Sequence, residues 1–167
     1  MKLLIHDLGK EAFNNDMLTS VDGKKIIYKD SEIHNCIGCF GCWIKTPAVC
    51  VIRDKYGDMG EILSKCDTVT IISKCFYGGF SPFIKNVMDR SISYVHPYFV
   101  KRNGEMHHRP RYENQFNLQV IFYGENITEK EKQTAIKLVK ANSVNLNCNL
   151  QEICFAKNIR EMEGITI

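Results

Sequence analysis

The sequence predicts an α/β fold, a doubly wound parallel sheet of five strands with helices on both faces. Short runs of apolar, β-branched or aromatic residues alternate with segments whose apolar residues recur at helical spacing. The chain has 167 residues, of which 44% are hydrophobic and 25% are charged. This length and composition are typical of one globular domain with its own core. We therefore expect residues 1–167 to form a single domain.

Five runs along the chain are expected to be strands. They are Leu3–Ile5, Lys25–Tyr28, Thr68–Ser73, Leu118–Tyr123 and Leu150–Phe155. Parallel strands need crossover connections, which are right-handed and place helices against the sheet. Five parallel strands in one domain favour the flavodoxin-like strand order 2-1-3-4-5.

Helical patterns lie between these runs. Tyr56–Lys65 carries apolar residues at helical spacing. Ser81–Tyr94 begins with a serine followed by proline, which fits an N-cap and the first helical position. Thr128–Asn142 begins with a Thr-x-x-Glu capping box. We also expect a short helix around Glu11–Leu18.

An insertion at residues 95–116 precedes the fourth expected strand, and loops of this length are usually functional or disordered. It is rich in aromatic residues, which a lone exposed loop would not hold in water. We therefore expect a homodimer with the insertion at its interface. The role of His107 and His108 stays open. With the arginines nearby they could bind an anionic ligand or the phosphate of a nicotinamide cofactor, or simply form a solvated or dimer-contact loop.

The densest chemical signal is a group of four cysteines with the spacing C-x2-C-x2-C-x7-C. They are Cys36, Cys39, Cys42 and Cys50. Thiolates this close together are soft ligands for a metal or an iron–sulfur cluster. Three cysteines at successive x2 gaps favour a [4Fe–4S] cluster over zinc, which usually takes two separated pairs. Zinc and metal-free redox-active thiols stay as alternatives.

Two loops are expected to form a site, because ligands of open α/β sheets bind beyond the carboxyl ends of the strands. The cysteine-rich loop at residues 34–54 follows the second strand and should lie at the rim of that crevice. The loop after the third strand has two glycines and several aromatic rings, which could stack on a flavin or nicotinamide or simply pack together. Its candidate cofactor-binding residues are Ser73, Cys75, Phe76, Tyr77, Gly78, Gly79 and Ser81.

The cysteine segment through Asp54 and the stretch from Ser73 to Arg90 together resemble the iron–sulfur flavoproteins and the related NAD(P)H-dependent FMN reductases. The two motifs cover roughly residues 35–90. The resemblance implies a flavodoxin-like fold, FMN on the loop after the third strand, and a [4Fe–4S] cluster on the four cysteines. It also implies NAD(P)H as a cosubstrate.

The first loop departs from this family. There the first strand normally runs into a Gly-Ser-Pro-Arg-type loop that holds the FMN phosphate at a helix N-terminus. Here the strand is followed by His6, Asp7 and Gly9, and no serine or threonine occurs before Thr19. The FMN-phosphate loop is therefore missing, and we expect FMN to bind more weakly than in relatives that have it.

Other functional classes receive little support. The net charge of +3 is too small to indicate nucleic-acid or membrane binding. The sequence has no apolar run of about 18 residues and no signal-peptide core, so we expect a cytoplasmic protein. It also has no hydrolase triad order, Walker loop or HExxH motif.

The expected function is therefore that of a flavodoxin-like redox protein. As an enzyme it would be an NAD(P)H-dependent flavin oxidoreductase that passes electrons to a redox partner or a small-molecule acceptor. The alternative is a degenerate flavodoxin-like binding or partner subunit that has lost FMN.

Overall fold

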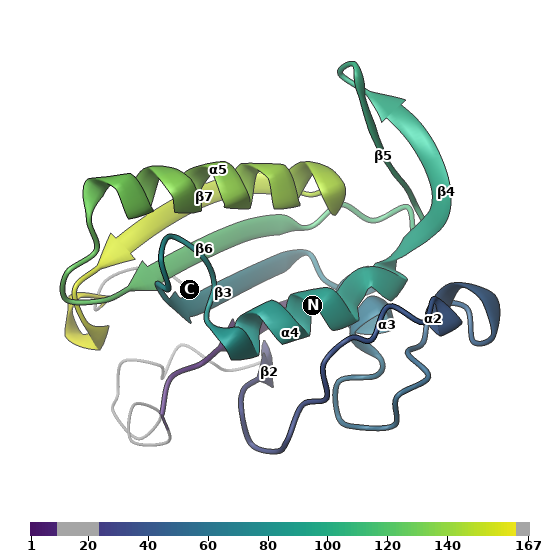
Figure 1. Ribbon diagram of the computed structural model, residues 1–167, viewed down its shortest axis with the longest axis horizontal. Coiled ribbons are helices and arrows are strands. Elements are labelled where there is room, and N and C mark those ends of the chain that lie inside the picture. The colour runs from purple at the N-terminus through teal and green to yellow at the C-terminus, as the bar shows by residue number, and fades with distance from the viewer. Residues whose placement is uncertain (10–23, 163–167) are drawn as a thin grey trace.

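The computed structural model describes residues 1–9 and 24–162, and these form an α/β fold around one parallel sheet (Figure 1). Its strands are β1 (Lys2–His6), β2 (Lys24–Ile27), β3 (Thr68–Lys74), β6 (Asn117–Tyr123) and β7 (Asn149–Ala156). The order across the sheet is β2-β1-β3-β6-β7, and every pairing is parallel. Counted along the chain, this is the predicted flavodoxin-like order 2-1-3-4-5.

Alternate residues of the strands face opposite sides of the sheet, as the period of a strand requires. On one side, Leu3, Val69 and Val120 join the larger apolar core. On the other side, Leu4, Ile72 and Ile121 form a smaller cluster. The inner strands β1, β3 and β6 are mostly buried, which is why their sequences are rich in apolar residues. The edge strands β2 and β7 together carry several exposed residues.

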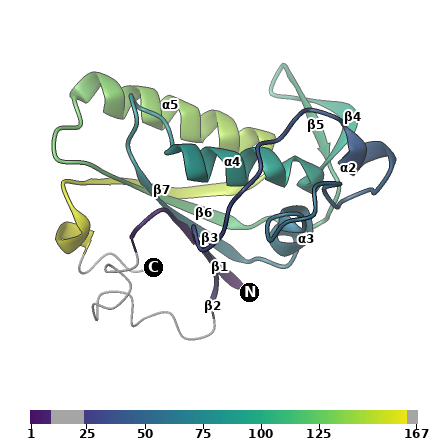
Figure 2. The ribbon, with the colours of Figure 1, turned by 60° about the horizontal axis from the view of Figure 1, so that its bottom comes forward.

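The described helices α3 (Met59–Ser64), α4 (Pro82–Arg90) and α5 (Glu129–Asn145) supply the helical side of the larger core. Figure 2 shows α4 and α5 on the same side of the sheet. The predicted caps are present, because the Ser81 hydroxyl caps α4 and Thr128 forms a reciprocal capping box with Glu131.

The smaller cluster is covered by the short 3-10 helix η3 (Ile159–Met162). The helix expected around Glu11–Leu18 lies outside the described residues. No helix in the part of the chain that the structure describes is long and apolar enough to cross a bilayer.

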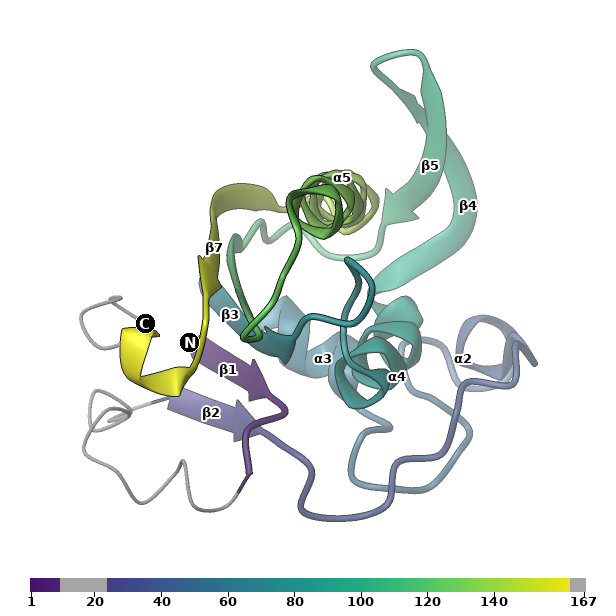
Figure 3. The same ribbon diagram turned by 60° about the vertical axis from the view of Figure 1, so that its left-hand side comes forward.

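The expected insertion at residues 95–116 contains an ordered β-hairpin rather than a long structureless loop. A 3-10 turn η2 (Ser91–Tyr94) leads into β4 (Val95–Arg102), which pairs antiparallel with β5 (Glu105–Pro110). The two residues between the strands, Asn103 and Gly104, have φ angles of 49° and 88°, as the tight turn of a two-residue hairpin requires. Figures 1 and 3 show the hairpin projecting beyond the sheet. It is tied to the end of α5 by bonds from Arg102 to the Val144 carbonyl oxygen and between His107 and Asn145.

Candidate functional site

The cysteine-rich loop does not stay at the carboxyl edge of the sheet, where the sequence placed it. The loop starts at the end of β2 and runs along α4 to the carboxyl end of that helix. There Arg90, the last residue of α4, binds the loop through Asp54 and the carbonyl oxygens of His34 and Ile52. These bonds, all donated by the Arg90 side chain, hold the loop at this end.

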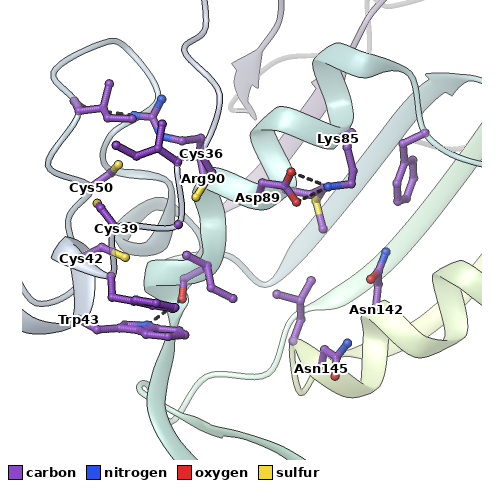
Figure 4. A pocket seen from close by; sticks show the side chains of 18 of the residues that line it. Cys36, Cys39, Cys42, Trp43, Cys50, Lys85, Asp89, Arg90, Asn142 and Asn145 are labelled. Atoms are coloured by element: carbon purple, nitrogen blue, oxygen red, sulfur yellow. Dashed lines mark hydrogen bonds and ion pairs between the residues drawn. The ribbon is translucent and has the colours of Figure 1, made fainter.

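The four cysteines line one cavity of about 700 Å³, and Figure 4 shows their sulfur atoms on the same side of it. Cys42 lies on the short helix α2 (Gly41–Ile44), and Cys50 follows the turn after it. Both are 9% exposed, whereas Cys36 and Cys39 are exposed to solvent. The site thus has two inner and two outer thiols.

Two glycines allow the backbone to fold this tightly around the cysteines. Gly38 has a φ of 65°, a left-handed conformation that costs other residues energy. At Gly41, an added Cβ would lie 2.5 Å from the Val51 side chain and 3.4 Å from the Cys39 sulfur. The first gap therefore favours glycine for its backbone conformation, and the second needs it for space.

Trp43 attaches the cysteine loop to the base of the hairpin. Its indole N–H donates to the carbonyl oxygen of Val95 at 2.9 Å. Its ring stacks on Phe40 with centroids 5.4 Å apart and meets His108 at 4.9 Å. Trp43, which lines the cavity, thus packs on the hairpin, and this contact ties the insertion to the site.

A buried ion pair lies beneath the thiols. The Arg90 side chain is fully buried and makes a bidentate bond to Asp54 at 2.7 and 2.9 Å. Burial alone would raise the pKa of Asp54, but hydrogen bonds from Arg90 and from backbone N–H groups lower it below its ordinary value. The neighbouring Asp89 does not share this pair, because it bonds Lys85 one turn earlier on α4.

The cavity continues as a groove between α4 and α5. The groove reaches Gly79 and Phe80 of the loop that the sequence predicts to bind a cofactor. Its lining is mainly apolar, with a few polar side chains from the two helices, and the lining residues that sequence reasoning missed include Met88, Leu138, Asn142, Asn145 and Leu146. They come from two helices far apart in the sequence. Of these groove-lining residues, only Met88 and Leu138 could have been predicted from the sequence to lie on a packed helix face, because of their helical spacing.

Hydrogen bonds of the Ser73 hydroxyl join the two ends of the loop between β3 and α4. The Ser73 side chain accepts the backbone N–H of Ser81 at 2.9 Å and donates to the carbonyl oxygen of Lys74. Ser73 is fully buried and Ser81 nearly so. Phe80 is 9% exposed and stacks on Phe122 in the core. These residues shape the loop from within.

The tip of this loop presents aromatic rings to solvent. Tyr77 is 90% exposed and Phe76 is 42% exposed. Gly78 has a φ of 80° and packs on α5, where an added Cβ would lie 2.7 Å from the Thr134 Cβ. The near neighbour of Gly78 is therefore α5.

At the carboxyl ends of β1 and β3, Asp7 occupies the position next to the first loop. Its carboxylate accepts the backbone N–H of Lys74 at 2.9 Å. Burial and the neighbouring Asp7 raise the pKa of the Tyr123 phenol above its ordinary range. This corner is acidic, so it does not favour a phosphate group.

The remaining cysteines lie apart from the cavity. Burial raises the thiol pKa of Cys66 and Cys154 to about 11 and that of Cys148 to about 12. Burial also raises the pKa of Cys75, whose backbone N–H pairs with Tyr123. Thiols that stay protonated at neutral pH are poor nucleophiles and metal ligands.

Within residues 1–9 and 24–162, no three histidine, cysteine or acidic side chains converge closely enough to hold a single metal ion. The four thiols share a cavity without meeting at one point. Burial and then the neighbouring thiols raise the pKa of Cys42, so a bound cation would be needed to stabilise its thiolate.

The fold and this site define the class of the protein, a flavodoxin-like α/β protein with a cysteine-lined groove. No family model matches the chain. The solved structures that share the fold include an FMN-dependent NADH-azoreductase of Bacillus anthracis in complex with FMN and an NADPH-quinone reductase of P. pentosaceus. The azoreductase is 12% identical to this chain, with a TM-score of 0.61, and the match covers 96% of this chain and 90% of the azoreductase. The quinone reductase is 9% identical, with a TM-score of 0.55, and the match covers 99% of this chain and 89% of the reductase.

In sequence, the chain is 31% identical over 84 residues to an iron–sulfur flavoprotein of Methanocaldococcus jannaschii. The match covers 50% of this chain and 42% of that relative, so this chain matches less than half of the relative's length. The predicted resemblance to the iron–sulfur flavoproteins and flavodoxin-like FMN reductases is confirmed.

Proposed function

We propose that this protein is a flavin-dependent oxidoreductase of the iron–sulfur flavoprotein type. The four cysteines of the groove would hold a [4Fe–4S] cluster, and FMN would lie on the loop between β3 and α4. The observation that carries the proposal is the groove itself, which joins the thiols to Gly79 and Phe80 in one cavity. Its volume of about 700 Å³ is in the ordinary range for a cofactor or substrate site.

The arrangement of the thiols suits a cluster better than zinc. A structural zinc ion needs four ligands about 2.3 Å from one centre. In a [4Fe–4S] cluster each cysteine ligates a different iron, so the sulfurs surround a larger body. The proposal therefore requires only that the four thiols line one cavity large enough for such a body, as they do.

Each part of the groove has a distinct task in this proposal. When bound, FMN exchanges one or two electrons and a cluster exchanges one, so the pair links NAD(P)H to one-electron acceptors. Cys42 and Cys50 hold the inner side of the cluster, and Trp43 covers it from the hairpin side. The acceptor would be a redox partner or a small molecule that enters from the exposed side of Cys36 and Cys39.

Similar proteins support the flavin half of this proposal. The B. anthracis azoreductase contains FMN, and the M. jannaschii relative is named an iron–sulfur flavoprotein. The alternative, a binding subunit that has lost FMN, draws on a single feature, the Asp7 carboxylate at the first loop. Flavodoxin-like reductases are the better-supported class.

Anaerobic reconstitution with iron and sulfide tests the cluster. We expect about four iron and four sulfide per chain and a broad visible absorption band. Cys39→Ser should lose most of the iron, whereas Cys154→Ser, a thiol outside the groove, should keep it. Iron that stays bound in Cys39→Ser, or a wild-type protein that takes up zinc but no iron–sulfur cluster, would refute the cluster.

A further inference from the structure

Arg90 has one unused hydrogen-bond donor beside the cysteines. A guanidinium group carries five N–H donors. The two terminal nitrogens of Arg90 are bonded to Asp54 and to the carbonyl oxygens of His34 and Ile52. Among the residues that the structure describes, no acceptor meets hydrogen-bond geometry with the remaining Nε–H, although the nitrogen is fully buried. A buried donor without a partner is costly, so its position needs an explanation.

The nearest explanation is the sulfur of Cys50. Arg90 and Cys50 line the same cavity, and Figure 4 shows the Arg90 side chain beside the thiols. The other partners of the guanidinium are all bound by its two terminal nitrogens, so the Nε–H is the donor left for this cavity. A neutral thiol is a weak acceptor, whereas a metal-bound thiolate is a much stronger one.

On the basis of the proposed function, we infer that the Nε–H of Arg90 is the hydrogen-bond donor to the Cys50 sulfur in the loaded centre, where it raises the reduction potential. Asp54 is the positioning residue, because its bidentate bond fixes the plane of the guanidinium. The bond stabilises the negative charge that one-electron reduction adds to the centre. Removing it should therefore make reduction less favourable.

The inference requires the Arg90 Nε–H to lie next to the Cys50 sulfur even before loading, and this proximity can be measured in the metal-free protein. In a 1H–15N spectrum, the Arg90 Nε–H should give a slowly exchanging side-chain signal that is lost in Arg90→Lys. We expect this signal to move in Cys50→Ser and to stay in place in Cys36→Ser, which alters an outer thiol. A signal that ignores Cys50→Ser would overturn the inference even if the cluster assembles. An Nε–H signal that moves in Cys50→Ser supports the inference even if no cluster assembles. The test therefore separates the inference about Arg90 from the proposal of a cluster.

The reduction potential of the reconstituted protein tests the consequence. Asp54→Asn combined with Arg90→Met removes both charges of a pair that is neutral overall, so the change reports mainly the lost donor. We expect the equilibrium constant for one-electron reduction to fall about tenfold, which is a shift of 59 mV to lower potential. Arg111→Gln is the matched control, because that guanidinium binds the carbonyl oxygens of Ser93 and Val95 and lies outside the groove. Equal potentials in the double variant and wild type would refute the assignment.

Discussion

Gly78 shows how one residue fixes the loop between β3 and α4. Its φ is 80°, and an added Cβ would lie 2.7 Å from the Thr134 Cβ and 2.8 Å from the Glu131 carbonyl oxygen. Gly78→Ala should therefore lose about 1–2 kcal/mol for the backbone conformation and a further ~1–3 kcal/mol for crowding against α5. Denaturant unfolding measures both.

Gly104 is the matched control for this prediction. It has a φ of 88°, but an added Cβ would meet nothing within 4 Å. Gly104→Ala should lose only the backbone part. If the two variants lose the same free energy of unfolding, the packing of Gly78 on α5 is not what holds the loop.

His6 links the stability of the sheet to pH. It ends β1, is fully buried, and its ring stacks on Tyr28 with centroids 5.6 Å apart. Burial lowers its pKa from 6.5 to about 4. The unfolded chain therefore binds a proton more readily than the folded one. The stability is complete above pH 6.5 and is lost as the pH falls towards 4, by at most about 3 kcal/mol.

His6→Phe should remove this part of the pH dependence and keep the stacked ring. The free energy of unfolding of wild type and variant is measured between pH 7 and 4. We expect the wild-type curve to fall more steeply. Parallel curves would mean that His6 takes up its proton as readily in the folded state as in the unfolded state.

At the scale of elements, the local signals in the sequence were sufficient for the sheet and the caps. Apolar runs predicted all five strands, and the Ser-Pro and Thr-x-x-Glu signals marked the starts of α4 and α5. Capping motifs and the apolar runs of buried strands are made of residues close together in the sequence, so they can be predicted from the sequence alone.

The hairpin was missed although its turn signal, Asn103-Gly104, is present. Its strands lack a clear alternation, because Tyr98 and Phe99 are both about two-thirds exposed. The position of the cysteine loop was missed for another reason. It depends on contacts between Arg90 and the segment around Asp54, and no local pattern reports contacts over such a separation.

The loop after β1 leads to a prediction about flavin affinity. Asp7 follows β1 and accepts the backbone N–H of Lys74, and the family that the sequence resembles is expected to place its phosphate loop after this strand. Each charge-assisted contact is worth about 1.5–3 kcal/mol, so losing two raises the FMN dissociation constant by roughly two to four orders of magnitude. Riboflavin should therefore bind nearly as well as FMN in a fluorescence titration.

Asp7→Asn tests the cause. Asparagine keeps an oxygen for the N–H of Lys74 but removes the charge, so FMN should gain affinity while riboflavin should not. Nanomolar FMN affinity in the wild type, with a large preference over riboflavin, would contradict the prediction.

For the whole molecule, we predict a homodimer with the hairpin at its interface. Tyr98, Phe99 and Met106 are each about two-thirds exposed on a hairpin that stands away from the sheet (Figure 3). Such apolar side chains favour burial against another surface. Light scattering at micromolar concentration should give twice the mass of the chain.

Tyr98→Ser combined with Phe99→Ser should shift this protein towards the monomer. Lys101→Ser, at an exposed position of the same strand, should leave the dimer intact. A monomeric wild type at micromolar concentration would refute the interface.

Helix α4 has a consequence for the rate at which electrons could move through this molecule. Its nine residues span about 13 Å, with the proposed flavin loop at its first turn and the thiols near its last. Electron tunnelling slows steeply with distance, so the length of α4 would set the rate of transfer between the proposed flavin site and the proposed cluster site. Adding one helical turn would lengthen the tunnelling path by about 5 Å without touching a ligand. Transfer within one chain should then slow sharply, whereas transfer between the centres of two different chains need not follow the length of this helix.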